Sequence, residues 1–176
     1  MTALVFVDTN VLVYARDNRD AAKRARAREW LELLWKDLRG RTSTQVLNEY
    51  YSLLTQRAKF QVDRKLAWDD VRELLKWRPQ EIDVETLNRA REIELNYQLN
   101  WWDCLIVAAA QAQGCSLLLT EDLQDKANYG GVTVRNPFLL GVEQEHTAYV
   151  APPKLNTRHR GRGRPRIRPQ RVASTS

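Results

Sequence analysis

Two acidic residues of this 176-residue chain come at or just after the end of short apolar runs. Asp8 directly follows Ala3-Leu-Val-Phe-Val7, and Asp122 comes soon after Leu117-Leu-Leu119. Such runs are typical of buried strands, and the carboxyl ends of parallel strands border the ligand crevice of an α/β sheet. We therefore expect both carboxylates at one rim of a sheet. Taken alone, Asp8 fits better as the N-cap of a helical turn starting at Val11.

Two further carboxylates are placed by helices. Asp103 lies in the first turn of a helix predicted over 101–113, capped by Asn100, where the helix dipole favours an anion. That helix is apolar nearly all round and should be buried, so a carboxylate on it is costly unless it is paired or binds a metal. The alternative is an Asp bonded to free backbone N–H groups of the first turn. Glu49 borders the apolar stripe of a helix predicted over 45–58, where a solvated Glu is the default.

The combination of the four carboxylates is more informative than any one of them. Four carboxylates at one rim would repel one another and raise some of their pKa values. A hard divalent cation such as Mg²⁺ removes that difficulty, because it prefers oxygen ligands and keeps several waters. A metal-activated water is what phosphodiester cleavage requires. At least one of Glu121, Asp122 and Asp125 is expected to be only solvated.

Other chemistries lack the necessary residues. His146 and His159 are isolated, so neither a zinc site nor a catalytic pair of histidines is indicated. The sequence has no Walker or GxGxxG loop, and the Ser and Cys candidates have no suitable His partner. Cys104 and Cys115 do not suggest a disulfide framework, which points to a reducing cytoplasm.

Short apolar strands alternate with amphipathic helices, which predicts an α/β fold of three layers, α/β/α, with a central parallel sheet. The segment 42–44 is too short to assign. In the helix over 20–38, capped by Asp20 and closed by Gly40, we expect Leu38 on the inward face. The predicted strands cover 3–7, 82–84, 116–119 and 132–134, and the predicted helices cover 20–38, 45–58, 69–77, 86–97 and 101–113.

The charge is divided between two parts of the chain. Residues 151–176 carry eight Lys or Arg and no acid, whereas the other 150 residues hold 20 basic and 22 acidic groups. Pro, Gly and Arg dominate from Pro152 onward, so this end cannot bury enough surface to offset its ordering entropy. We therefore predict a domain over 1–145 and a basic, disordered tail over 146–176. No apolar run is long enough to span a membrane.

The tail contains Arg162-Gly163-Arg164-Pro165, which looks like an AT-hook. In such a motif an extended Arg-Gly-Arg lies in a narrow A·T minor groove. The simpler alternative, which we favour slightly, is a salt-sensitive tether for any nucleic acid, DNA or RNA.

Four motifs resemble those of PIN-domain nucleases, within them the VapC-like ribonuclease toxins of type II toxin–antitoxin pairs, and they follow the family's order over residues 4 to about 140. They are Phe6-Val-Asp-Thr-Asn-Val-Leu-Val-Tyr14, Thr44-Gln-Val-Leu-Asn-Glu49, Trp102-Asp-Cys-Leu-Ile-Val-Ala108 and Leu118-Leu-Thr-Glu-Asp-Leu123.

The resemblance implies an acidic site that binds Mg²⁺ or Mn²⁺, formed by Asp8, Glu49, Asp103 and Asp122. It also implies that Asn10 and Thr120 orient ligands or water by hydrogen bonding. Members of this group cleave single-stranded RNA or structured RNA loops, commonly as homodimers inhibited by a cognate antitoxin. The basic tail departs from the compact toxins. The alternative function is therefore a non-catalytic nucleic-acid-binding protein, with a degenerate PIN domain and the tail making the contacts.

Overall fold

The computed structural model describes residues 3–57 and 60–139 of this chain. The basic tail predicted over 146–176, its AT-hook-like motif and the domain limit at residue 145 lie outside the described residues. Within the described ranges, no helix is long and apolar enough to cross a membrane.

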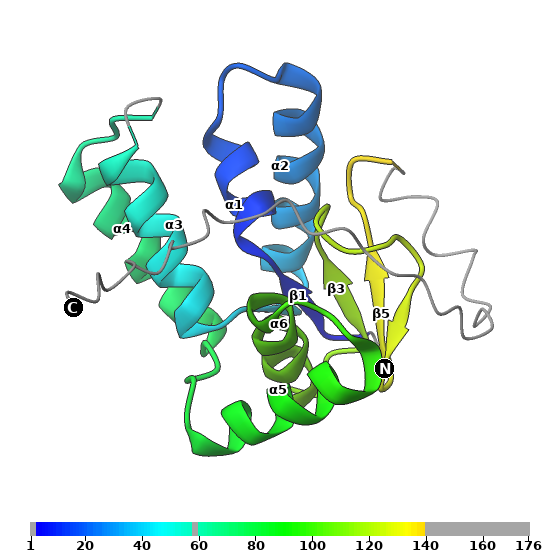
Figure 1. Ribbon diagram of the computed structural model, residues 1–176. Helices are drawn as coiled ribbons and strands as arrows, with labels where there is room; N and C mark the ends of the chain where they lie inside the picture. Colours follow the sequence, from blue (N-terminus) through cyan, green and yellow to red (C-terminus); the bar gives the residue numbers. More distant parts are fainter. Residues whose placement is uncertain (1–2, 58–59, 140–176) are drawn as a thin grey trace, which may run out of the picture.

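A five-stranded sheet with the order β2-β1-β3-β5-β4 forms the centre of the fold (Figure 1). β1 pairs in parallel with β2 and β3, β3 pairs in parallel with β5, and β4 is antiparallel to β5. The mostly parallel sheet confirms the predicted α/β class. The strands are β1 (Val5–Val7), β2 (Gly40–Arg41), β3 (Leu117–Leu119), β4 (Asn128–Tyr129) and β5 (Val132–Arg135).

Six α-helices and one 3-10 turn are found in the described ranges. Asp20 and Asn100 cap α2 and α6 as predicted, because each side chain accepts a hydrogen bond from a free backbone N–H of the first turn. The elements are α1 (Thr9–Arg16), α2 (Ala21–Lys36), α3 (Thr44–Gln56), α4 (Arg64–Leu74), η1 (Leu75–Trp77), α5 (Val84–Tyr97) and α6 (Trp101–Ala112).

The strand order decides where the helices lie. From β1 the chain passes through α1 and α2 to β2 on one side of β1, and it later returns through α3–α6 to β3 on the other side. Because connections between parallel strands are right-handed, these two opposite moves place their helices on opposite faces of the sheet. In Figure 1, α5 and α6 pack against each other, as do α3 and α4. The carboxyl ends of β1 and β3 lie at the point where the chain changes direction, which is where α/β sheets form their ligand crevice.

The predicted strand over 82–84 is wrong. Asp83 caps α5 through a hydrogen bond from Thr86 N, and Val84 is the first residue of that helix, with 73% of its surface exposed. An apolar–polar–apolar triplet is too short to separate a strand from a helix start, and here the capping Asp decided the outcome. The chain keeps one parallel bridge nearby, between Ser43 and Gln80.

Other predicted limits also shift. Leu38 is not on the inward face of a helix, because α2 ends at Lys36 and Leu38 is 75% exposed with a φ of 56°. Gly40 does not close the helix but begins β2. The helix predicted from residue 69 begins at Arg64, capped by Asp63. β4 was not predicted, since two residues carry too little pattern.

Candidate acidic active site

Asp8 and Thr120 lie side by side because of the strand register. Val7 pairs with Leu119, so the next residue of each strand comes to the same point of the rim, and Asp8 N donates to the carbonyl of Leu119 at 3.1 Å. The hydroxyl of Thr120 donates to Asp8 Oδ2 at 2.8 Å. Asp8 is 8% exposed and Thr120 is fully buried. Two residues 112 positions apart are thus bonded in the interior.

Asp8 is also the N-cap of α1, since its Oδ1 accepts from Thr9 N at 2.6 Å. The capping interpretation of the sequence and the site interpretation therefore apply to the same side chain. The helix starts two residues earlier than the turn expected at Val11. Capping leaves Oδ2 facing the rim, where Thr120 and Asn10 reach it.

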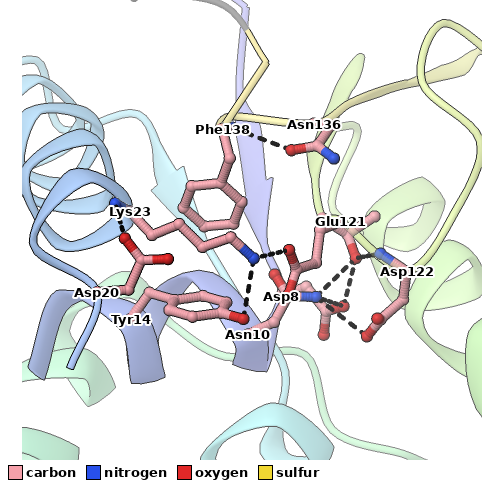
Figure 2. A network of polar contacts seen from close by, with 10 residues as sticks. Asp8, Asn10, Tyr14, Asp20, Lys23, Glu121, Asp122, Asn136 and Phe138 are labelled. Atoms are coloured by element: carbon pink, nitrogen blue, oxygen red, sulfur yellow. Dashed lines mark hydrogen bonds and ion pairs between the residues drawn. The ribbon is translucent and has the colours of Figure 1, made fainter. Parts of the chain in front are cut away.

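Asn10 joins the two strand-end carboxylates. Its Nδ2 lies 3.1 Å from Asp8 Oδ2, 2.9 Å from Thr120 Oγ1 and 3.1 Å from Asp122 Oδ2 (Figure 2). Asp122 N in turn donates to Thr120 Oγ1 at 3.1 Å. Asn10 Oδ1 is buried and has no hydrogen-bond partner among the described residues. An unpaired buried oxygen beside carboxylates is costly, and it is a donor atom of the kind that a hard cation prefers.

Glu49 approaches the same group from α3. Its Oε2 accepts from the hydroxyl of Thr9 at 3.2 Å, and its Oε1 accepts from Gln45 Nε2 at 3.2 Å. Gln45 Nε2 also lies 3.5 Å from the carbonyl of Trp102, at the start of α6. Gln45 is buried, and its Oε1 has no partner in the described part of the chain. Sequence reasoning missed Thr9 and Gln45, although Gln45 precedes Glu49 by four residues and so shares its helix face.

Asp103 is placed differently from the expectation. Residues Cys104–Ala110 of α6 are all buried, but Asp103 is only half-buried and Trp102 beside it is 44% exposed. The argument from burial in an apolar helix is therefore wrong for Asp103, because α6 begins at the rim and buries itself only after its first turn. Asn100 contacts the carboxylate through its Nδ2 and accepts from Asp103 N at 3.1 Å. The contacts of Gln45 with Glu49 and Trp102 link this helix start to the group around Asp8.

The choice among the three acids after β3 has a geometric basis in the structure. Glu121 forms an ion pair with Lys23 at 2.6 Å, and Asp125 accepts from Asn136 N at 2.8 Å. Asp122 contacts the Asn10 amide that also contacts Asp8. Asp122 is thus the member of the three that shares a donor with Asp8.

The surroundings of Asp8 strongly change the pKa of its carboxyl group. Burial raises its pKa, hydrogen bonds from Thr120 and Thr9 lower it, and the charges of Asp122 and Glu49 raise it again, with a net pKa of about 7. A carboxyl group whose pKa is raised to about neutral pH by burial and by neighbouring carboxylates is a feature of functional sites.

The oxygen atoms of this site are of the kind that binds a hard cation, but they do not lie close enough together to surround one. The carboxylates and the unpartnered Asn10 Oδ1 are oxygen donors of the type that Mg²⁺ and Mn²⁺ take. In residues 3–57 and 60–139, however, no three His, Cys, Asp or Glu residues form a group that could hold a metal ion. Asp8 and Asp122 share the Asn10 amide, and Glu49 contacts Thr9 beside Asp8. Asp103 lies at the start of α6, which is connected to this group where Gln45 contacts the carbonyl of Trp102.

The fold and the site define an α/β protein with an acidic rim at the switch point of its sheet. The chain belongs to the PIN-domain family, whose profile matches residues 5–127. A comparison with curated proteins finds no significant match.

Solved structures confirm the fold. A toxin–antitoxin complex from Klebsiella pneumoniae is similar with a TM-score of 0.56 and 20% identity, covering 76% of this chain and 97% of that one. DNA-bound VapBC from Salmonella typhimurium gives 0.56 and 15% identity, covering 77% and 99%. FitAcB from Neisseria gonorrhoeae gives 0.55 and 18% identity, covering 78% and 100%. The resemblance inferred from the sequence is thus confirmed for the family and the fold.

Proposed function

We propose that this chain is a metal-dependent endoribonuclease that hydrolyses RNA phosphodiester bonds. The observation that carries the proposal is the buried Asp8, joined through Thr120 and Asn10 to Asp122, next to an amide oxygen that has no partner among the described residues. Membership of the PIN-domain family and the fold shared with toxins of toxin–antitoxin complexes support it.

The metal-holding residues proposed are Asp8, Glu49, Asp103 and Asp122, with Mg²⁺ as the cation and Mn²⁺ as its substitute. When bound there, such an ion supplies an activated water and neutralises charge on the scissile phosphate. Asn10 and Thr120 hold the Asp8 and Asp122 carboxylates in one orientation, and Thr9 and Gln45 do the same for Glu49.

The biological role that we propose is that of the toxin in a type II toxin–antitoxin pair. Three of the similar structures are a toxin–antitoxin complex or a VapBC pair, and two of them are bound to DNA. We accordingly propose a cognate antitoxin that covers the site, a homodimeric assembly and a single-stranded or looped RNA substrate.

RNA cleavage with Mg²⁺ tests the catalytic proposal. Asp8→Asn and Asp103→Asn should each lower kcat by about 100-fold or more, since the loss of even an outer-shell partner of a metal site costs roughly 10–100-fold. Asp69→Asn is a matched control, because it removes an exposed carboxylate that pairs with Arg72 on α4. It should leave cleavage unchanged.

If the wild type and all three variants cleave alike, the cleavage comes from a contaminant and the catalytic proposal is wrong. If none of them cleaves while the full chain binds RNA, the non-catalytic alternative becomes the better description.

A further inference from the structure

Lys23 of α2 turns inward toward the acidic rim, although the start of that helix is otherwise basic and solvated. Its Nζ lies 2.6 Å from Glu121 Oε2 and 3.0 Å from the hydroxyl of Tyr14 (Figure 2). The side chains of Lys23 and Glu121 are 30% and 23% exposed. The pair is thus mostly removed from water, where an ion pair has more effect than one on an open surface.

The ammonium group lies against two aromatic rings that are in contact with each other. Lys23 Nζ lies 4.3 Å from the ring centroid of Tyr14 and 5.1 Å from that of Phe138, and these rings meet edge to face at 5.0 Å. Burial lowers the pKa of Lys23, but hydrogen bonds with Glu121 and Tyr14 raise it by more, so the group stays charged. The residues come from four segments: α1, α2, the turn after β3 and the chain after β5.

In the sequence, Glu121 lies between Thr120 and Asp122, which both take part in the hydrogen-bond network around Asp8. Thr120 donates to Asp8, and Asp122 both accepts from Asn10 and donates its backbone N–H to Thr120 Oγ1. The Lys23–Glu121 ion pair therefore holds the middle residue of the turn 120–122, while its two neighbours face Asp8. The ammonium group of Lys23 also offsets the negative charge of Glu121, which reduces its repulsion of the neighbouring carboxylates.

We propose that Lys23 is a positioning residue. Its ammonium group, which lies against the Tyr14 and Phe138 rings, holds Glu121 by an ion pair and so keeps Asp122 and Thr120 aligned with Asp8 for metal binding. This inference rests on the proposed function, because it concerns the metal affinity of the same site. Lys23 acts through Glu121 and touches neither metal nor substrate.

The Mn²⁺ affinity of the full chain, measured by calorimetry without RNA, distinguishes a positioning role of Lys23 from the electrostatic effect of its charge. Loss of one positive charge near an acidic site should by itself tighten cation binding. Lys23→Met keeps an unbranched side chain beside the two rings but removes the ammonium group. If Lys23 positions the turn, Lys23→Met should instead weaken Mn²⁺ binding by about tenfold, as found for outer-shell partners.

Three variants complete the test. Arg24→Met removes the same charge from the next residue, which contacts Asn18, and should bind Mn²⁺ as tightly as the wild type or more tightly. Lys23→Arg keeps a cation that can pair with Glu121 and should restore most of the affinity. Adding Glu121→Gln to Lys23→Met should cause little further loss, because the partner of Glu121 is already gone.

Hydrogen exchange in the metal-free protein gives a second reading. The amide of Asp122 should exchange severalfold faster in Lys23→Met than in the wild type or Arg24→Met, since its acceptor Thr120 lies in the freed turn. A thermal unfolding scan of each variant checks that the whole domain is intact.

The proposal is overturned if Lys23→Met binds Mn²⁺ with unchanged or tighter affinity. Weaker RNA binding with unchanged Mn²⁺ affinity also overturns it, since Lys23 would then act as a phosphate contact. Failure of the wild type itself to bind Mn²⁺ would instead refute the proposed metal site, which keeps the two failures apart.

Discussion

Asp8 caps a helix and also lies at the centre of the candidate site. Its Oδ1 caps α1 through Thr9 N, and its Oδ2 faces Thr120 and Asn10 at the rim. Burial makes the ionised form of this carboxylate costly when no cation is present. The site therefore carries a free-energy cost that should be visible in the stability of the metal-free protein.

We predict that Asp8 makes the metal-free domain less stable as the pH rises from about 4 to about 7. The folded-state pKa of about 7 lies above the ordinary value of 3.8, so in this window the folded protein keeps a proton that the unfolded chain has lost. The cost is absent below pH 4 and complete above pH 7, where it is on the order of 4 kcal/mol. Urea unfolding of the wild type and Asp8→Asn in a chelator, at several pH values, measures it.

The relevant quantity is the difference between the free energies of unfolding of the wild type and Asp8→Asn, followed as the pH changes. Taking this difference cancels the pH effects that the two proteins share. A difference that stays constant from about pH 4 to about pH 7.5 would contradict the raised pKa. Adding Mn²⁺ at about pH 7.5 should raise the unfolding temperature of the wild type and leave that of Asp8→Asn nearly unchanged.

At the scale of elements, β2 shows how packing sets a strand that the sequence hardly marks. Gly40 begins β2 and pairs with Val5 of β1. A Cβ added to Gly40 would lie 2.4 Å from Cε2 and Cζ2 of Trp77, whose ring is buried and meets Trp35 at 4.9 Å. The glycine is therefore required by the close approach of the Trp77 indole, which η1 brings against the sheet edge.

We predict that Gly40→Ala lowers the free energy of unfolding by about 1–3 kcal/mol, the usual cost of overpacking. The methyl group would force either the Trp77 ring or β2 to move. Urea unfolding monitored by Trp fluorescence measures the change.

Trp77→Phe serves as the background that tests the cause. A smaller ring leaves room for the methyl group, so Gly40→Ala should cost clearly less in Trp77→Phe than in the wild type. An equal cost in both backgrounds would show that the contact with Trp77 is not responsible.

At the scale of the whole molecule, charge is separated between the slightly acidic residues 1–150 and the basic residues 151–176. The 150 residues before Ala151 carry 20 basic and 22 acidic groups, and the eight remaining cations follow it. If the acidic rim receives RNA, as we propose, its own charge repels that polyanion rather than attracting it. A separate basic segment can supply that attraction without placing cations among metal ligands.

We predict that deletion of residues 152–176 weakens RNA and DNA binding and flattens its salt dependence. For each phosphate that the shortened chain no longer neutralises, the slope of log K against log salt should flatten by about 0.7 for single strands and about 0.9 for B-DNA. Fluorescence anisotropy between about 50 and about 300 mM salt measures both effects. Unchanged affinity would exclude the tail from binding.

A paired substitution distinguishes the two interpretations of the tail. Arg162→Ala with Arg164→Ala should abolish a preference for A·T-rich duplex if the motif acts as an AT-hook. A general tether would instead lose affinity equally for every sequence.

Much of the site could be predicted from the sequence. Three features were visible in the sequence: the apolar runs before Asp8 and Thr120, the helix caps Asp20 and Asn100, and the separation of charge. They depend on residues that are close in the sequence, so they can be recognised without the tertiary structure. The α/β class followed from the alternation of apolar runs and amphipathic helices, and the family followed from the resemblance of four motifs to those of PIN-domain nucleases. Local propensity was weakest for short elements: two residues define β2 and β4, and the triplet at 82–84 became a helix start.

The tertiary structure decided which side chains share the interior. Only the register of β1 against β3 brings Asp8 to Thr120, and only the crossover through α2 brings Lys23 to Glu121, because these contacts join residues 112 and 98 positions apart. The sequence predicted a buried carboxylate at Asp103, whereas the structure has the buried carboxylate at Asp8. The difference arises because burial depends on which elements pack over a residue. The four acids that the sequence suggested as a group thus acquire separate surroundings, and those surroundings set the contacts of each.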